Sequence, residues 1–217
     1  MESRVREALT DHHVGQRHLD RMVMLSDGVF AIAITLSAIE LKPEEDLAAT
    51  VLQAWGRPLL LYFLSFLLIG SLWFLHRRIV AHLRDVDAVG TVLNLLTLSL
   101  VALVPVVVRY ALAQSATGED LHKGFIVYAS GVGLTYACAG VMWGYLAFIA
   151  RLAPDVERNL ARVWLLELVS APMLMAAAVF YDIQQQVPAL VLTVLALGVL
   201  AAKRRYRRLA KAARGAG

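Results

Sequence analysis

The chain has 217 residues, of which 59% are hydrophobic and 18% are charged, and its formal net charge is +4. Soluble domains contain about 45–50% apolar residues, so this composition excludes an ordinary soluble domain. The apolar residues are gathered in blocks long enough to cross a bilayer as helices. We therefore predict an all-α, polytopic membrane protein that forms one domain over residues 1–217. Its six predicted spans are at about 22–41, 51–76, 88–112, 124–150, 160–181 and 186–203.

The first predicted span contains a carboxylate in an otherwise apolar run. Residues Met22 to Ala38 are interrupted only by small polar groups and by Asp27. A charge in such a segment is expensive to bury, so Asp27 must face protein, water or a counter-charge. A membrane helix of this kind is predicted to do more than anchor the chain.

One face of the first span has a regular apolar pattern. At about 100° per residue, Gly28, Ile32, Thr35, Leu36 and Ile39 fall on one stripe, and Asp27 lies away from it. By default such a stripe packs against a neighbouring helix or lipid. Repeated around a symmetry axis, it would form stacked apolar rings that close a pore by excluding water. The hydroxyl groups of Thr35 would then lie where a partly dehydrated cation could use them.

The second span ends, at residues 73–78, in an aromatic and then basic edge that is typical of a cytosolic interface. Its polar side chains lie at a depth similar to that of Asp27. We predict one structural polar cluster made by Arg21, Ser26, Asp27, Trp73 and His76. Arg21 lies on another face of an ideal helix, so its pairing with Asp27 would need a local break or a contact between helices. The alternative interpretation makes Asp27 and His76 a proton relay.

The later spans carry few polar residues. Gly140 and Gly144 form a Gly-xxx-Gly motif, which predicts a close helix contact. Glu167 is expected to pair with a base such as Arg162 or to form hydrogen bonds between helices. The tail after the last span has seven bases and no acid between Lys203 and Arg214, which predicts contact with anionic lipids and not with nucleic acid.

The basic residues predict the orientation. With six spans, 17 of the 21 Lys and Arg residues lie on the side of the membrane that carries both termini. This excess predicts that both termini face the cytosol, and we expect the protein in the plasma membrane. The bases of the opposite side are Lys42, Arg57, Arg109 and Lys123. That side is nevertheless acidic, and Glu40, at the end of the first span, is predicted to attract cations there. The role of Arg109 stays open.

The segment from Arg21 to Leu36 resembles the first-helix signature of the transmembrane protein 175 family, which comprises endosomal and lysosomal potassium channels and their prokaryotic relatives. The residues that match in place are Arg21, Ser26, Asp27 and Thr35. Leu25 replaces the usual Phe, and Ser37 stands where the family generally has an aliphatic residue. The end of the second span, with Trp73 and His76, is also similar to the prokaryotic branch.

The resemblance implies a homotetramer in which the four first helices line one pore. It implies that Ile32 forms the constriction, that Leu36 and Ile39 continue the apolar lining, and that Thr35 contributes to potassium preference. It also implies no Thr-Val-Gly-Tyr-Gly filter, and that sequence does not occur in the chain. The chain is thus expected to work without a cofactor, with K⁺ as its permeant ion.

Three classes of function compete. The leading hypothesis is a passive cation channel with a modest preference for potassium over sodium. The second is a proton-coupled secondary transporter that uses Asp27, His76 and Glu167, although the chain lacks the internal repeat that many transporters show. The third, an enzyme within the membrane, is not expected, because no catalytic or metal-binding motif is recognisable.

Overall fold

The computed structural model describes residues 2–39, 41–43, 50–117 and 121–215. Within these ranges every regular element is helical, and no strand occurs. The elements are α1 (Glu2–Ile39), α2 (Val51–Val80), α3 (Ala88–Thr117), α4 (Leu121–Gly144), the short π-helix η2 (Tyr145–Ile149), α5 (Arg158–Asp182) and α6 (Gln186–Gly215). Six of these helical stretches are long and apolar enough to cross a membrane, so the predicted all-α membrane fold is confirmed.

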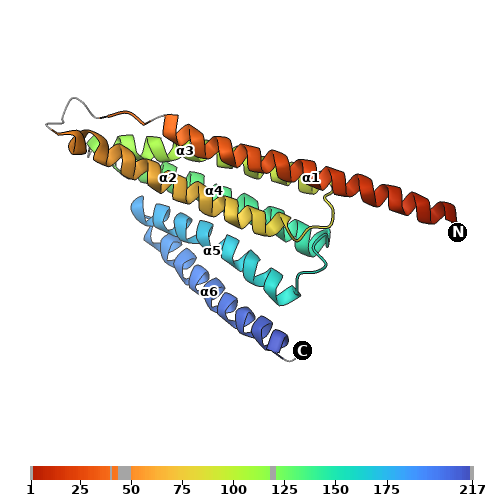
Figure 1. The fold of residues 1–217 in the computed structure, drawn as a ribbon. Helices are drawn as coiled ribbons and strands as arrows, with labels where there is room; N and C mark the ends of the chain where they lie inside the picture. The colour runs from red at the N-terminus through yellow and green to blue at the C-terminus, as the bar shows by residue number, and fades with distance from the viewer. Residues whose placement is uncertain (1, 40, 44–49, 118–120, 216–217) are drawn as a thin grey trace.

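The helices are longer than the spans that the sequence predicts. The largest differences are at the two ends of the chain, where α1 begins at Glu2 instead of near residue 22 and α6 continues to Gly215 instead of ending near residue 203. Hydropathy marks only the part of a helix that suits the membrane, whereas residues such as Arg, Lys, Glu and Ala continue a helix into water with little cost. Figure 1 shows the N-terminal part of α1 projecting beyond the bundle.

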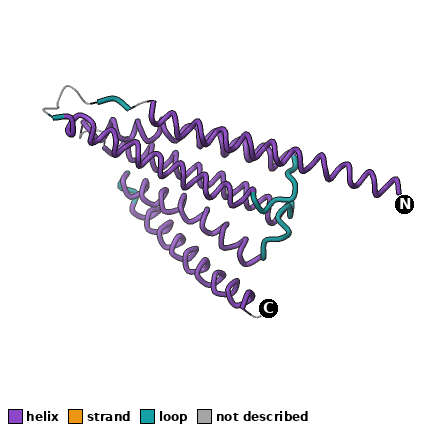
Figure 2. Tube along the Cα trace, viewed as in Figure 1, coloured by secondary structure: helices purple, strands orange, loops and turns teal. Residues whose placement is uncertain are grey.

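Both termini lie at one end of the bundle, together with the α2–α3 and α4–α5 connections (Figures 1 and 2). These two connections are joined to each other. The backbone N–H of Arg84 donates to the carbonyl of Leu152 at 3.1 Å, and its guanidinium donates to both carboxylate oxygens of Asp155 at 3.1 and 2.7 Å. The hydrogen bonds and the opposite charge of Asp155 raise the pKa of Arg84 above its ordinary value.

Most of the buried apolar side chains among the described residues belong to one of two clusters. One cluster joins α1, α2 and α3, with Phe30, Ala33, Ile69 and Leu72 among its members. The other lies toward the end that carries the termini and includes the fully buried Trp143, whose indole N–H donates to the carbonyl of Ala161 at 3.0 Å. The first cluster holds α1 against the bundle, and the second holds α5 against α4.

Small residues bring α4 and α5 together. A Cβ placed on Gly140 would lie 3.4 Å from Cβ of Leu168, and one placed on Gly144 would lie 3.5 Å from Leu165. Side chains larger than a methyl group would therefore push α5 away. This confirms the packing role predicted for the Gly-xxx-Gly motif.

Glu167 forms bonds between helices, which confirms one of the two alternatives expected for it, but the base named in the other alternative, Arg162, is not its partner. Its two carboxylate oxygens contact Arg78 of α2 at 3.2 Å and Lys203 of α6 at 3.3 Å. Arg162 instead donates to Asn159 at 3.5 Å and lies over the ring of Tyr206. Five residues separate Arg162 from Glu167, which puts them about 140° apart around α5. Glu167 thus ties α6, which packs mainly on α5, to the rest of the bundle.

Candidate functional site

The two faces of α1 have different surroundings. On one face, Met22, Ser26, Phe30 and Ala33 are buried against the chain's own helices. On the other face, residues of the predicted stripe stay uncovered, with 60% of Ile32, 41% of Leu36 and 74% of Ile39 exposed. The helix thus uses one side to join its own bundle and leaves the other free.

The uncovered face is open along its length. A Cβ placed on Gly28 would meet nothing within 4 Å outside the helix itself, and Thr35 is exposed one helical turn beyond Ile32. Apolar side chains need no cover by their own chain in a membrane, but they need lipid or a second protein surface against them. This face is therefore available to other copies of the chain.

The hydroxyl of Thr35 is held by its own helix. Its oxygen donates to the carbonyl of Ile32 at 2.9 Å and lies 3.1 Å from the carbonyl of Ala31. A hydroxyl has one hydrogen and two acceptor lone pairs. Because the hydrogen is used by the backbone, the lone pairs of Thr35 are left for a partner on the exposed side.

Behind α1, hydrogen bonds run through three helices. His76 of α2 donates from Nε2 to the side-chain oxygen of Asn94 at 2.6 Å, and Asn94 of α3 donates to Oγ of Ser26 at 3.1 Å. Ser26 in turn donates to the carbonyl of Met22 at 2.7 Å. Ser26, His76 and Asn94 are all buried, so this chain of bonds fixes the rotation of α1 against α2 and α3.

Asp27 follows Ser26 on α1, but its side chain bonds to Trp73 of α2 and not to Asn94 of α3. Its carboxylate accepts a hydrogen bond of 2.8 Å from the indole N–H of Trp73, and the guanidinium of Arg77 lies over that indole ring, 5.3 Å from its centre. The structure thus joins Asp27 to Trp73, and Ser26 to His76 through Asn94. Arg21 is exposed and lies outside the cluster, because α1 runs as an unbroken helix from Arg21 to Asp27 and keeps the two side chains on different faces.

The residue that sequence reasoning missed is Asn94. It links His76 to Ser26 and is almost fully buried, at 1% exposure. An amide in an apolar span was a visible signal, since a polar group there needs a partner on a neighbouring helix. Glu40, the predicted outer attractor of cations, lies outside the described residues.

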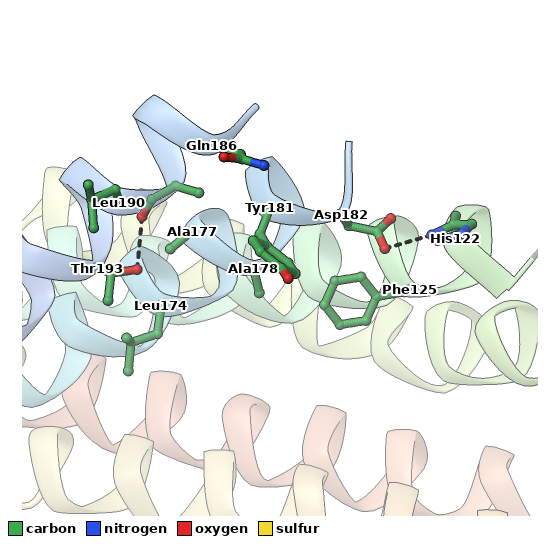
Figure 3. Close-up of a pocket in the computed structure, with 11 residues that line it drawn as sticks. His122, Phe125, Leu174, Ala177, Ala178, Tyr181, Asp182, Gln186, Leu190 and Thr193 are labelled. Atoms are coloured by element: carbon green, nitrogen blue, oxygen red, sulfur yellow. Dashed lines mark hydrogen bonds and ion pairs between the residues drawn. The ribbon is translucent and has the colours of Figure 1, made fainter. Parts of the chain in front are cut away.

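A cavity away from α1 is the first to consider. It has a volume of about 930 Å³ and lies between the start of α4, the end of α5 and the start of α6. Figure 3 shows Phe125, Leu174, Tyr181 and Leu190 along it, with the ion pair between His122 and Asp182, 2.7 Å long, at one end. None of the residues described as lining this cavity belongs to α1, so it is not part of the exposed stripe.

A smaller cavity of about 220 Å³ lies between α1, α2 and α3 at the opposite end from the termini. Lys42, Arg57 and Arg109 line it, together with the hydroxyls of Ser37 and Tyr62. Three of the four bases predicted for that side therefore gather close to the end of α1.

These observations define a class: a six-helix membrane protein whose first helix is fixed from behind by buried hydrogen bonds and presents an uncovered apolar stripe. Residues 21–105, which include the signature, the end of α2 and most of α3, match the model of the family described as endosomal/lysosomal potassium channel TMEM175.

Individual relatives agree with this match. The chain is 30% identical over 189 residues to a potassium channel of Streptomyces collinus, and the match covers 76% of this chain and 92% of that protein. It is also 30% identical over 113 residues to proteins of mouse and human named endosomal/lysosomal proton channel TMEM175. Here the match covers 46% of this chain and less than a quarter of the relatives, at 23% and 22%. No solved structure matches the chain.

The chain belongs to the TMEM175 family. The match with the Streptomyces protein extends over nearly the whole of that relative, whereas the animal proteins are several times longer than the region they share with this chain. The resemblance seen in the signature residues is thereby confirmed.

Proposed function

We propose that the protein is a potassium-selective cation channel in which four copies of the chain place α1 around one central pore. The observation that carries this proposal is the exposed stripe of Gly28, Ile32, Thr35, Leu36 and Ile39. One stripe on one helix cannot enclose a path, so a pore lined by it needs several copies. The Streptomyces relative, whose name is potassium channel, supports the ion.

In this assembly the ring of Ile32 is the constriction. A narrow apolar ring gives an ion no ligands in place of its hydration water, so it limits the flow of ions. Leu36 and Ile39 extend the apolar lining. Thr35 offers hydroxyl lone pairs next to the ring, and such side-chain ligands give a modest preference for potassium over sodium.

The polar cluster has a structural role in the proposal. The bonds of Ser26, Asn94 and His76 and the bond between Asp27 and Trp73 fix which face of α1 points to the axis. In a membrane, hydrogen bonds between helices act together with close packing to fix the rotation of a helix, because lipid is as apolar as the buried side chains. Removing a member would leave a buried polar group without its partner.

We further propose that both termini face the cytosol and that the protein resides in the plasma membrane. The excess of Lys and Arg on the side of the termini supports this orientation. The exposed bases of α6 beyond residue 203 then lie at the inner membrane surface, where anionic lipids attract them. Glu40 would lie at the outer entrance and raise the local concentration of cations.

Proton movement is the alternative that the comparisons favour, because the animal relatives are named proton channels. The related hypothesis, a proton-coupled transporter, would use Asp27, His76 and Glu167. In the structure Glu167 belongs to a separate network with Arg78 and Lys203, so hydrogen bonds do not link it to the other two. A carboxylate between two cations is suited to holding helices together.

The test is an ion flux assay with the purified full chain in liposomes, with potassium, sodium and choline compared. A valinomycin control shows that the vesicles are intact. Flux down a potassium gradient, weaker for sodium and absent for choline, is expected without any proton gradient. Potassium flux that occurs only with an imposed proton gradient would contradict the channel and favour the transporter.

Two further measurements separate the alternatives. A pH-sensitive dye inside the same vesicles reports whether protons move when potassium is absent. If Glu167 only joins helices, the variant Glu167→Gln is expected to keep its potassium flux. If the variant still assembles but its ion flux no longer depends on protons, Glu167 belongs to a proton relay.

A further inference from the structure

A further cavity lies at the end of the bundle that carries the termini. It has a volume of about 390 Å³ and lies where η2 ends and α5 begins. Three arginines line it, namely Arg151, Arg158 and Arg162. The rest of its lining is apolar and includes Phe148 of η2 and Val156 of the connecting loop.

The positive charge of this cavity is not balanced by nearby carboxylates. No described carboxylate lies within ion-pair distance of Arg151 or Arg158. Of the two acids of the same loop, Asp155 binds Arg84, and Glu157 accepts a hydrogen bond from Asn159 through Oε1, while its buried Oε2 has no hydrogen-bond partner among the described residues. Neither acid lines the cavity.

The backbone is shaped to present these arginines. The π-helical turn of η2 closes with the N–H of Ala150 on the carbonyl of Tyr145 at 2.9 Å, and Leu152 donates to Leu146 at 2.9 Å. Between them Arg151 takes a left-handed conformation with φ of 54°. Glycine is the usual residue for such a conformation, since a side chain there is disfavoured. The chain nevertheless keeps an exposed arginine at this bend.

The cavity lies at the membrane boundary. The apolar span of α4 and η2 ends at Ile149, and the span of α5 begins at Arg158. Ile149 follows the cavity-lining Phe148 in the chain and is 74% exposed, so an exposed apolar side chain stands between this part of the lining and Arg151 in the sequence. Arginine forks bind phosphate oxygens well, and basic pockets between membrane helices on the cytosolic side bind the headgroups of anionic lipids.

We propose that this cavity is a binding site for the phosphate of an anionic phospholipid from the leaflet on the side of the termini. Arg151 and Arg158 bind the phosphate, Arg162 completes the positive wall from its place over Tyr206, and the acyl chains run along Phe148 and Ile149. The apolar flank favours a lipid over a soluble phosphate, which would leave that surface unused. The site does not depend on ion conduction.

The experiment measures lipid binding to the purified full chain in detergent by native mass spectrometry. The probes are dioleoyl-phosphatidylglycerol and, as the zwitterionic comparison, dioleoyl-phosphatidylcholine. The double variant R151Q/R158Q is compared with R17Q/R21Q, which removes two exposed arginines of α1 away from the cavity and has the same net charge. Both pairs are exposed, so gel filtration is expected to show the wild-type assembly for each variant.

The affinity of R151Q/R158Q for phosphatidylglycerol is expected to fall by about thirtyfold, which corresponds to about 2 kcal/mol. R17Q/R21Q is expected to stay within about threefold of the wild type, and R151K/R158K to recover part of the loss. An equal loss in both glutamine variants would show a diffuse basic surface and overturn the site. Equal binding of phosphatidylcholine would overturn it too, and displacement of the lipid by inorganic phosphate would identify a soluble ligand instead.

Discussion

The two faces of α1 are similar in hydropathy and opposite in surroundings. Phe30 and Ala33 are each 1% exposed and pack into the bundle, whereas Ile32 and Ile39 of the same helix are 60% and 74% exposed. The buried face also carries the hydrogen bonds of Ser26, and the exposed face carries only the hydroxyl of Thr35. In a membrane helix an apolar side chain therefore does not mark the protein core, because apolar side chains are equally stable against lipid.

The largest expected effect is on the stability of the protein, and it differs between substitutions on the two faces of α1. Phe30→Ala leaves a cavity between α1, α2 and α3 and is expected to lower the free energy of unfolding by about 3–5 kcal/mol. Ile32→Ala, on the exposed face, is expected to change it by less than about 1 kcal/mol. Denaturant unfolding of both variants in the same detergent measures the difference. Equal losses would mean that the exposed stripe is structural core.

The next prediction concerns the bonds that fix the buried face. Asn94→Leu removes the link between His76 and Ser26 and leaves two buried groups short of a partner, so it is expected to lower the free energy of unfolding by about 2 kcal/mol. Ser99→Ala is the control, because Ser99 is exposed and donates only to its own helix at Leu96. Thermal unfolding of both variants measures the difference. If Asn94→Leu is as stable as the wild type, Asn94 does not link the helices as we propose.

The exposed face is tested by its effect on flux. Ile32→Asn places a polar group in the proposed constriction and is expected to raise potassium flux roughly tenfold, which is about 1.4 kcal/mol of barrier. Ile32→Leu keeps the ring apolar and is expected to leave the flux near that of the wild type. The liposome assay compares them at equal protein content. If Ile32→Asn conducts like the wild type, the constriction lies elsewhere.

The smallest expected effect is on ion preference. Thr35→Val keeps the shape and removes the hydroxyl, and we expect the preference for potassium over sodium to fall by roughly two- to fivefold, which is less than about 1 kcal/mol. Thr193→Val is a matched control, since Thr193 also donates to its own helix, at Ala189, but lies on α6. Reversal potentials in mixed potassium and sodium solutions measure the preference. No shift for Thr35→Val would take Thr35 out of this role.

Much of this molecule follows from local sequence. The six apolar blocks require helices, since only a helix satisfies its own backbone within lipid. The positions of Gly28, Ile32 and Ile39 on one stripe follow from the geometry of any helix. The grouping of Asp27 with Trp73 and His76 was predictable because the polar residues of neighbouring spans lie at a similar depth.

The tertiary structure decided which helix faces meet. Asn94 bonds to Ser26, 68 residues away in the sequence, and Glu167 bonds to Arg78, 89 residues away. The periodic pattern of a single helix does not predict contacts at such sequence separations. The exclusion of Arg21 from the cluster likewise depended on α1 staying straight. Hydropathy and helix geometry act within one segment, whereas the rotation of a helix about its axis is set by the packing and hydrogen bonds of its neighbours. The sequence by itself therefore determined the helices and their stripes, and packing determined which stripe of α1 was buried and which was left open.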